Sequence, residues 1–256
     1  ETTVMAAALH VVTAGVGPRI VFVHGSATDA ATWSIQLAPR STLREHFTLV
    51  SYTRRSTGSV EDHAADAIEL IGAEPSLIVG SSFGAVVALE VLRRKLPAVR
   101  GAVLIEPPMA ADDATPAAPL AFLAEFDRRV AEQGGAAAGE FFLRTVLGDV
   151  AFDRIPEAFR ERSIQRWAEI RADSHALIAY RPRYAELSSI ATPVLLLGGD
   201  RSAAYFRPTL EALRRALPTA QLELIRGAGH MLHAEAHRQF AGLVSAFAAR
   251  CGLAPA

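Results

Sequence analysis

The sequence predicts an α/β fold, in which a doubly wound and mostly parallel β-sheet is covered by helices on both faces. Short runs of β-branched and aliphatic residues alternate with longer segments whose apolar residues recur at helical spacing. The predicted strands Thr48–Tyr52, Ser76–Val79 and Ala102–Ile105 are nearly continuous in apolar residues, as expected for buried strands that are covered on both faces. The chain has 256 residues, half of them hydrophobic, and is therefore long enough to bury a full core.

Seven segments are predicted to be strands. They are expected at Leu9–Thr13, Arg19–His24, Thr48–Tyr52, Ser76–Val79, Ala102–Ile105, Val194–Leu197 and Gln221–Ile225. Four helices are expected between and after them, at Val60–Ile71, Ala85–Arg94, Thr209–Leu217 and Arg238–Ala249. Because a parallel strand pair needs a long crossover connection, this alternation of strands and helices indicates a parallel sheet.

The alternation stops between Pro108 and Thr192. Amphipathic segments replace it, separated by the glycines of Gly134-Gly135 and by Gly148. Helices are expected here at Leu120–Glu132, Ala138–Leu147, Pro156–Ala172 and Ser174–Tyr180. We therefore predict a sheet domain made of residues 1–108 and 192–256, with residues 109–191 inserted as a helical cap over the strand ends.

Composition and charge exclude several classes of protein. A formal net charge of −1 argues against a general nucleic-acid binder, which needs a basic field. Cys251 is the only cysteine, so no intrachain disulfide and no thiolate metal cluster can form. No apolar run reaches the roughly 18 residues of a membrane span, and residues 1–5 do not resemble a signal peptide. A cytoplasmic monomer or homodimer is expected.

The strongest local signal is Gly80-Ser81-Ser82-Phe83-Gly84, a G-x-S-x-G motif between an aliphatic strand and a helix. Such a turn exposes the central serine hydroxyl above the sheet edge, and a Cβ atom at either glycine would collide with the chain. In the alternative interpretation the segment is an ordinary tight turn in which Ser81 or Ser82 only caps the helix. The strand-turn-helix context favours Ser82 as a nucleophile.

A second signal, His24-Gly25-Ser26-Ala27, ends the second predicted strand. Glycine at this point lets the following amides turn toward the serine. We expect the N–H of Ser26 or Ala27, together with the N–H of Phe83, to stabilise an oxyanion. His24 itself is expected to hold the loop through hydrogen bonds and not to transfer protons.

The order of these motifs resembles that of the α/β-hydrolase family, in its serine-nucleophile branch, over essentially the whole chain. The serine motif is followed by Gly198-Gly199-Asp200 after a strand and by Gly227-Ala228-Gly229-His230 near the end. This matches the family order of nucleophile, acid and histidine. The resemblance implies that Ser82 attacks the substrate, that His230 is the general base and then the general acid, and that Asp200 orients His230. It implies no cofactor and no metal.

Glu106 is the alternative acid, because it follows the strand after the nucleophile helix, where some family members carry this residue. The segment between Asp200 and His230 holds one helix and one strand, as the fold requires, and this favours Asp200. His233 and His237 follow His230 closely, but the pattern differs from the His-Glu-x-x-His of a zinc site. His233 is therefore expected to be structural.

The loop after the third predicted strand departs from the family pattern. It contains Arg54 and Arg55 but lacks the aspartate and the first glycine of the usual Asp-x-Arg-Gly sequence. Both arginines are expected to be structural or solvated. A serine at position 82, where other branches have an aspartate, argues against a haloalkane dehalogenase or an epoxide hydrolase.

The predicted function is a serine hydrolase that cleaves a carboxylic ester or thioester of a small, mostly apolar substrate through an acyl-enzyme. A C–C bond hydrolase, lactonase or perhydrolase with the same triad is an alternative. A ligand receptor without turnover is an alternative of another class. The apolar pocket is predicted to include His24, Gly25, Met109, Phe122, Phe126, Phe142, Trp167 and Met231.

Overall fold

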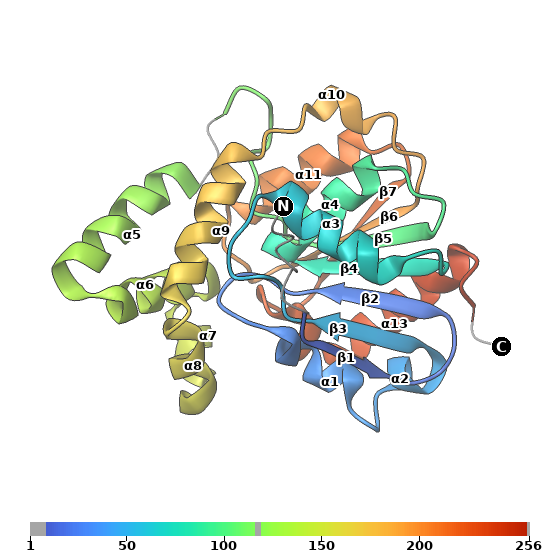
Figure 1. The fold of residues 1–256 in the computed structure, drawn as a ribbon, viewed down its shortest axis with the longest axis horizontal. Coiled ribbons are helices and arrows are strands. Elements are labelled where there is room, and N and C mark those ends of the chain that lie inside the picture. The colour runs from blue at the N-terminus through green and yellow to red at the C-terminus, as the bar shows by residue number, and fades with distance from the viewer. Residues whose placement is uncertain (1–8, 116–118, 255–256) are drawn as a thin grey trace, which may run out of the picture.

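The computed structural model describes residues 9–115 and 119–254. Its centre is a seven-stranded sheet with the strand order β1-β3-β2-β4-β5-β6-β7 (Figure 1). β1 is antiparallel to β3, and the other neighbouring strands are parallel. This arrangement confirms the predicted fold class. The strands are β1 (Val11–Ala14), β2 (Arg19–Val23), β3 (Thr48–Tyr52), β4 (Ser76–Ser81), β5 (Val99–Ile105), β6 (Val194–Gly199) and β7 (Ala220–Ile225).

One face of the sheet is covered by long helices. Val21 and Val23 of β2 pack with α3 and α4 in a large hydrophobic cluster on this face. α3 begins at a capping box, in which the side chains of Ser59 and Asp62 each accept a hydrogen bond from the other residue's backbone N–H. The helices on this face are α3 (Val60–Ile71), α4 (Phe83–Arg93) and α11 (Phe206–Ala216).

The opposite face carries α13 and the short helices after β2. Ile20 and Phe22, which alternate with the valines of β2, pack here with Trp33 and Phe240. Two covered faces explain why residues 20–23 of β2 form an unbroken apolar run. The helices are η1 (Ala30–Trp33), α1 (Ser34–Leu37), α2 (Thr42–His46) and α13 (His237–Arg250), with α12 (Leu232–Glu235) before α13.

Some elements differ from the prediction. η1, α1 and α2 are not predicted, because helices of four or five residues are too short to show helical periodicity. β5 begins at Val99 and not at Ala102, because Val99 still pairs with Ser76 of β4. Residues 1–5, which the sequence predicts not to be part of a signal peptide, lie outside the described residues. Within the described ranges, no helix is long and apolar enough to cross a membrane.

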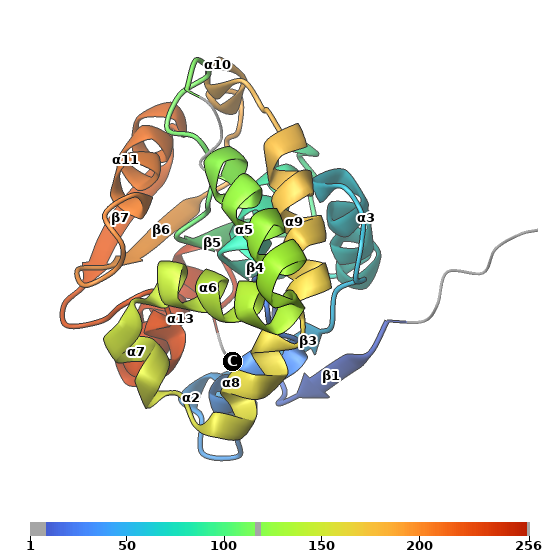
Figure 2. The ribbon, with the colours of Figure 1, turned by 90° about the vertical axis from the view of Figure 1, so that its left-hand side faces the viewer.

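Five of the helices between β5 and β6 form a layer that we call the cap. The cap lies beside the carboxyl ends of the parallel strands (Figures 1 and 2). It has its own hydrophobic cluster, which includes Phe126, Phe152 and Ile170 together with Ala27 from the loop after β2. The cap helices are α5 (Pro119–Gln133), α6 (Gly135–Leu147), α7 (Asp149–Arg154), α8 (Glu157–Ile164) and α9 (Trp167–Ala179).

The predicted helix Pro156–Ala172 is wrong, because the chain breaks it into α8 and α9. Two tertiary contacts form this corner. The Ile164 carbonyl lies against Gly139 of α6, where any side chain would collide with it. The Arg166 side chain pairs with Asp29 of the loop after β2, with 2.7 Å between Nη2 and Oδ2. Neither contact has a local sequence signature.

The end of the cap merges with the main core. Tyr180 packs in the same cluster as the sheet, and its hydroxyl donates a hydrogen bond to Glu90 of α4 at 3.0 Å. Leu187 of α10 (Tyr184–Leu187) and Ile190 are also part of that cluster. The division of the chain at residues 109 and 191 stays a prediction.

Candidate active site

Ser82 lies in the sharp turn between β4 and α4. Its backbone has φ 55° and ψ −122°, a strained conformation for a residue with a side chain. A Cβ atom at Gly80 would lie 2.2 Å from the Gly84 carbonyl oxygen, and one at Gly84 would lie 2.1 Å from the Val23 carbonyl oxygen. Both glycines of the motif are therefore required by close backbone approach.

His230 lies in the loop between β7 and α12. Its ring stacks on Phe206, with 4.4 Å between the ring centroids and an interplanar angle of 6°. Its Nδ1 atom lies 2.6 Å from Oε2 of Glu106, and both side chains are at most 5% exposed. The other carboxylate oxygen of Glu106 accepts a hydrogen bond from the Gly199 N–H at 2.8 Å. The carboxylate thus bridges the histidine and the end of β6.

The structure corrects the predicted partner of His230. Asp200 is exposed, and its Oδ1 accepts a hydrogen bond from the Gly227 N–H at 2.7 Å. It therefore ties the turn after β6 to the turn after β7 and does not contact the imidazole. Glu106, the alternative from the sequence, follows β5 directly with φ 44° and is 1% exposed.

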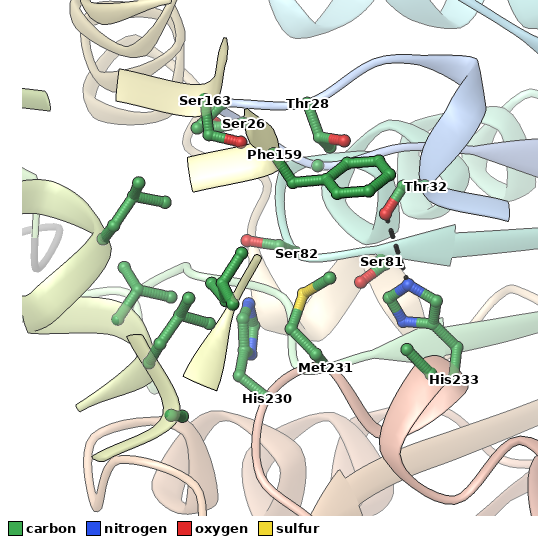
Figure 3. Close-up of a pocket in the computed structure, with 18 of the residues that line it drawn as sticks. Ser26, Thr28, Thr32, Ser81, Ser82, Phe159, Ser163, His230, Met231 and His233 are labelled. Atoms are coloured by element: carbon green, nitrogen blue, oxygen red, sulfur yellow. Dashed lines mark hydrogen bonds between the residues drawn. The ribbon is translucent and has the colours of Figure 1, made fainter. Parts of the chain in front are cut away.

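A cavity of about 500 Å³ lies between these loops and the cap. Ser82 and His230 both line it, with Met231 beside them and Phe159 of the cap across from them (Figure 3). In the described part of the chain, no hydrogen bond joins the Ser82 hydroxyl to His230. The cap contributes an apolar wall of Phe142, Leu143, Val146, Leu147, Ile155 and Phe159.

Only part of the predicted pocket lines this cavity. Gly25, Phe142 and Met231 do so. Met109 belongs to the main core instead. Phe122, Phe126 and Trp167 belong to the hydrophobic cluster inside the cap, because their rings face the neighbouring cap helices.

His24, which was also predicted to lie in the pocket, is buried behind it. Its Nε2 accepts a hydrogen bond from the Arg54 N–H at 2.9 Å, so its Nδ1 carries a proton and donates to the Gly25 carbonyl at 2.7 Å. Burial, and then the neighbouring Arg54, hold the pKa of His24 well below its ordinary value. A neutral His24 that holds the loop fits the role expected of it.

The three candidate oxyanion donors lie around Ser82. Ser26 and Ala27 line the cavity, and Phe83 is the first residue of α4. Gly25 brings their loop against the serine, since a Cβ atom at Gly25 would lie 3.0 Å from Cβ of Ser82. Among the hydrogen bonds of the described residues, none uses the N–H of Ser26, Ala27 or Phe83. These three N–H groups therefore have no hydrogen-bond partner within the described residues.

His233 also lines the cavity but is held by the core. Its ring packs against that of Trp33, with 4.6 Å between the ring centroids, and its Nε2 lies 3.3 Å from the Thr32 hydroxyl oxygen. Burial, and then the neighbouring His230, lower the pKa of His233 to about 3, so it is neutral near pH 7. Across residues 9–115 and 119–254, no group of three or more histidine, cysteine, aspartate or glutamate side chains is arranged to hold a metal ion.

Sequence reasoning missed the role of Asp173 on α9. Its carboxylate pairs with Arg54 at 2.8 Å and also accepts a hydrogen bond from the Ser26 hydroxyl at 2.6 Å. Asp173 and Arg54 are 119 positions apart, so no local pattern connects them.

Known proteins resemble this chain along most of its length. A family model described as "Alpha/beta hydrolase family" matches residues 20–243. The chain belongs to this family. One relative is carboxylesterase YbfK from Bacillus subtilis (strain 168), which is 24% identical to this chain over 245 residues. The match covers 88% of this chain and 79% of the relative.

Solved structures show the same fold. A thermophilic esterase from Thermogutta terrifontis superposes with a TM-score of 0.78 at 22% identity, covering 95% of this chain and 93% of the other. An enol-lactonase from Burkholderia xenovorans LB400 superposes with a TM-score of 0.77 at 20% identity, covering 93% of this chain and 95% of the other. Proteins with this fold thus include both an esterase and an enol-lactonase, so the function of this chain must be argued from its site.

Proposed function

We propose that this hydrolase-family chain is a serine hydrolase, which cleaves a carboxylic ester or thioester of a small, mostly apolar substrate through an acyl-enzyme. One observation carries the proposal. Ser82, on its strained turn, shares a cavity with His230, and the imidazole is paired with the buried carboxylate of Glu106. A nucleophile, a base and a group that orients the base are the parts that acyl transfer needs.

The pairing of His230 with Glu106 determines which ring nitrogen can act as a base. An ionised carboxylate only accepts hydrogen bonds, so Nδ1 of His230 carries a proton and Nε2 is left free. Nε2 takes the proton of Ser82 as the hydroxyl attacks the substrate carbonyl, and the charge on Glu106 stabilises the resulting imidazolium. The contact between Ser82 and His230 is expected to tighten when substrate binds.

The oxyanion and the leaving group complete the cycle. Oxygen charge in the tetrahedral intermediate is stabilised by the N–H of Phe83 and by that of Ser26 or Ala27. The protonated His230 then gives its proton to the leaving alcohol or thiol, and the acyl group stays on Ser82. Water attacks this ester with His230 as general base, which releases the acid and restores the enzyme.

The cavity supports the substrate class. Its cap wall is apolar, and a volume of about 500 Å³ suits a small molecule. The curated relative is a carboxylesterase, which agrees with ester cleavage. Of the cap aromatic residues that the sequence predicts for the pocket, only Phe142 lines the cavity; the rest of the apolar wall consists of Leu143, Val146, Leu147, Ile155 and Phe159.

A fluorophosphonate probe and a series of p-nitrophenyl esters from acetate to octanoate test the proposal. Wild-type protein is expected to be labelled at Ser82 and to hydrolyse the esters. Ser82→Ala should abolish labelling and reduce kcat by at least about 10⁴-fold. The control Ser188→Ala, which replaces an exposed serine after α10, should leave both unchanged. Absence of labelling in the wild type would reject Ser82 as nucleophile.

Labelling without ester hydrolysis would favour one of the alternatives. A C–C bond hydrolase, lactonase or perhydrolase would use the same residues on another substrate. A receptor would bind a ligand in the cavity without turnover. The probe reacts with an activated serine whatever the natural substrate is. Labelling therefore tests whether Ser82 is the nucleophile, and ester hydrolysis tests which reaction it catalyses.

A further inference from the structure

A buried ion pair connects the cap to the loop after β3. The guanidinium of Arg54 pairs with the carboxylate of Asp173 on α9 through two hydrogen bonds of 2.8 and 3.2 Å. The Arg54 and Asp173 side chains are 5% and 4% exposed, respectively. Two-point pairing of this kind fixes the orientation of both side chains.

The same guanidinium holds the loop that carries one proposed oxyanion donor. Nε of Arg54 donates to the His24 carbonyl and Nη2 donates to the Gly25 carbonyl, both at 3.1 Å. In a trans peptide the C=O and the N–H point in opposite directions. Because the Gly25 carbonyl is held toward Arg54, the N–H of Ser26 in the same peptide is directed away from it.

Three further contacts extend the arrangement. The Ser26 hydroxyl donates to Oδ2 of Asp173 at 2.6 Å, so the cap holds the side chain of the residue whose N–H is the proposed donor. The guanidinium of Arg54 also lies 4.3 Å from the ring centroid of Phe83, whose N–H is the other proposed donor. Ala27 packs into the hydrophobic cluster of the cap. The pair therefore contacts both sides of the proposed oxyanion site.

We propose that Asp173 is a positioning residue, which orients the Ser26 N–H through Arg54 and Ser26 and so makes the oxyanion site depend on the seating of the cap. The inference rests on the proposed function, since it assumes that an oxyanion forms at Ser82. When α9 is displaced, Arg54 and Ser26 both lose their hydrogen bonds to Asp173. The peptide between Gly25 and Ser26 is then less firmly held.

The first test compares three variants in steady-state kinetics. Asp173→Asn keeps the shape of the side chain but removes its charge. Ser26→Ala keeps the N–H but removes the hydroxyl bond to Asp173. Asp127→Asn is the matched control, because Asp127 forms an exposed ion pair with Arg171, also on α9.

A positioning role predicts a loss in kcat with little change in KM. Removing a whole oxyanion donor costs about 10²–10³-fold, so misdirecting one is expected to cost about 10–100-fold in Asp173→Asn. Ser26→Ala should lose about 3–10-fold, and Asp127→Asn should stay within about twofold of the wild type. Affinity for a trifluoromethyl ketone should fall by the same factor as kcat, because Ser82 adds to its carbonyl and creates the same oxyanion.

The second test reads the loop without requiring turnover. Hydrogen exchange of the Arg54 amide, which donates a hydrogen bond to Nε2 of His24 in this loop at 2.9 Å, should be faster in Asp173→Asn and in Ser26→Ala than in the wild type, and unchanged in Asp127→Asn. If Asp173→Asn does not fold, the kinetic and hydrogen-exchange measurements on Ser26→Ala test the inference instead. Folded variants with wild-type kcat, or with unchanged exchange, overturn the inference.

The outcomes distinguish this inference from the proposed function. A wild-type protein that the fluorophosphonate does not label rejects the proposed function, and the exchange measurement still decides whether Asp173 holds the loop. A labelled and active wild type with an equally active Asp173→Asn rejects the positioning role alone.

Discussion

The two sides of the cavity are built differently. On the sheet side, Ser82, Glu106 and His230 follow three separate strands and are held by short hydrogen bonds and backbone contacts. On the cap side the wall is mostly apolar, and two of its arginines, Arg162 and Arg166, pair with Asp29 of the loop after β2. In the proposed function, the sheet side carries the chemistry and the cap side selects the substrate.

The largest expected effect tests which carboxylate on the sheet side supports His230. If Glu106→Gln keeps its amide oxygen on the Gly199 N–H, its amide nitrogen faces Nδ1 of His230. That donor favours a proton on Nε2, so His230 cannot accept the proton of Ser82. We expect kcat to fall by about 10³–10⁴-fold on a p-nitrophenyl ester.

Asp200→Asn is the matched control. An asparagine oxygen can still accept the hydrogen bond of the Gly227 N–H, so kcat should change less than about threefold. A larger loss in Asp200→Asn than in Glu106→Gln would assign the acid to Asp200, as the sequence alone favours. Circular dichroism and the thermal midpoint of each variant show whether it is folded.

This pair of residues shows how far the sequence reaches. The turn at Ser82 and the loop of His230 could be predicted, because each has a local pattern of glycines and apolar residues. Glu106 and Asp200 follow β5 and β6, which are neighbours in the sheet, so chain order places a carboxylate near the histidine in either case. Side-chain direction and burial decide between them, and these depend on packing across the sheet.

The cap was less predictable for the same reason. Its helical nature follows from periodicity, but the corner between α8 and α9 depends on contacts with Gly139 and Asp29, which are distant in the sequence. The predicted aromatic lining was mostly wrong, because Phe122, Phe126 and Trp167 fill the interior of the cap. Periodicity shows which residues are buried on a helix but not which neighbour buries them.

The second effect concerns stability on the sheet side and comes from His233. Its pKa is lowered to about 3 by burial and then by His230, whereas an unfolded histidine has a pKa of about 6.5. Because the pKa of His233 is lower in the folded state, protonation of this histidine favours unfolding. The stability that depends on neutral His233 is therefore fully present above pH 6.5 and is lost as the pH falls toward 3. Relative to pH 7.0, the loss at pH 4.5 is about 2.5 kcal/mol, or roughly 70-fold in the folded-to-unfolded ratio.

Urea unfolding at pH 7.0 and 4.5 measures this contribution. His233→Gln cannot be protonated, so its free energy of unfolding should fall by about 2.5 kcal/mol less between these pH values than that of the wild type. His237→Gln replaces an exposed histidine at the start of α13 and should retain the wild-type dependence. Equal pH dependence in all three proteins would mean that His233 is not held neutral.

The smallest effect tests the cap side directly. Val146→Phe adds bulk to the cap wall of the cavity, whereas Val150→Phe adds the same bulk at an exposed position that does not line it. Excluding one or two methylene groups of a bound acyl chain costs about 0.8 kcal/mol each, so Val146→Phe should lower kcat/KM on the octanoate ester by about 4–15-fold. The acetate ester does not need this space and should react at a nearly unchanged rate, as should both esters with Val150→Phe. Equal losses on both esters would instead mean that the substitution reaches Ser82 or His230, and the division of roles between the two sides of the cavity would then be wrong.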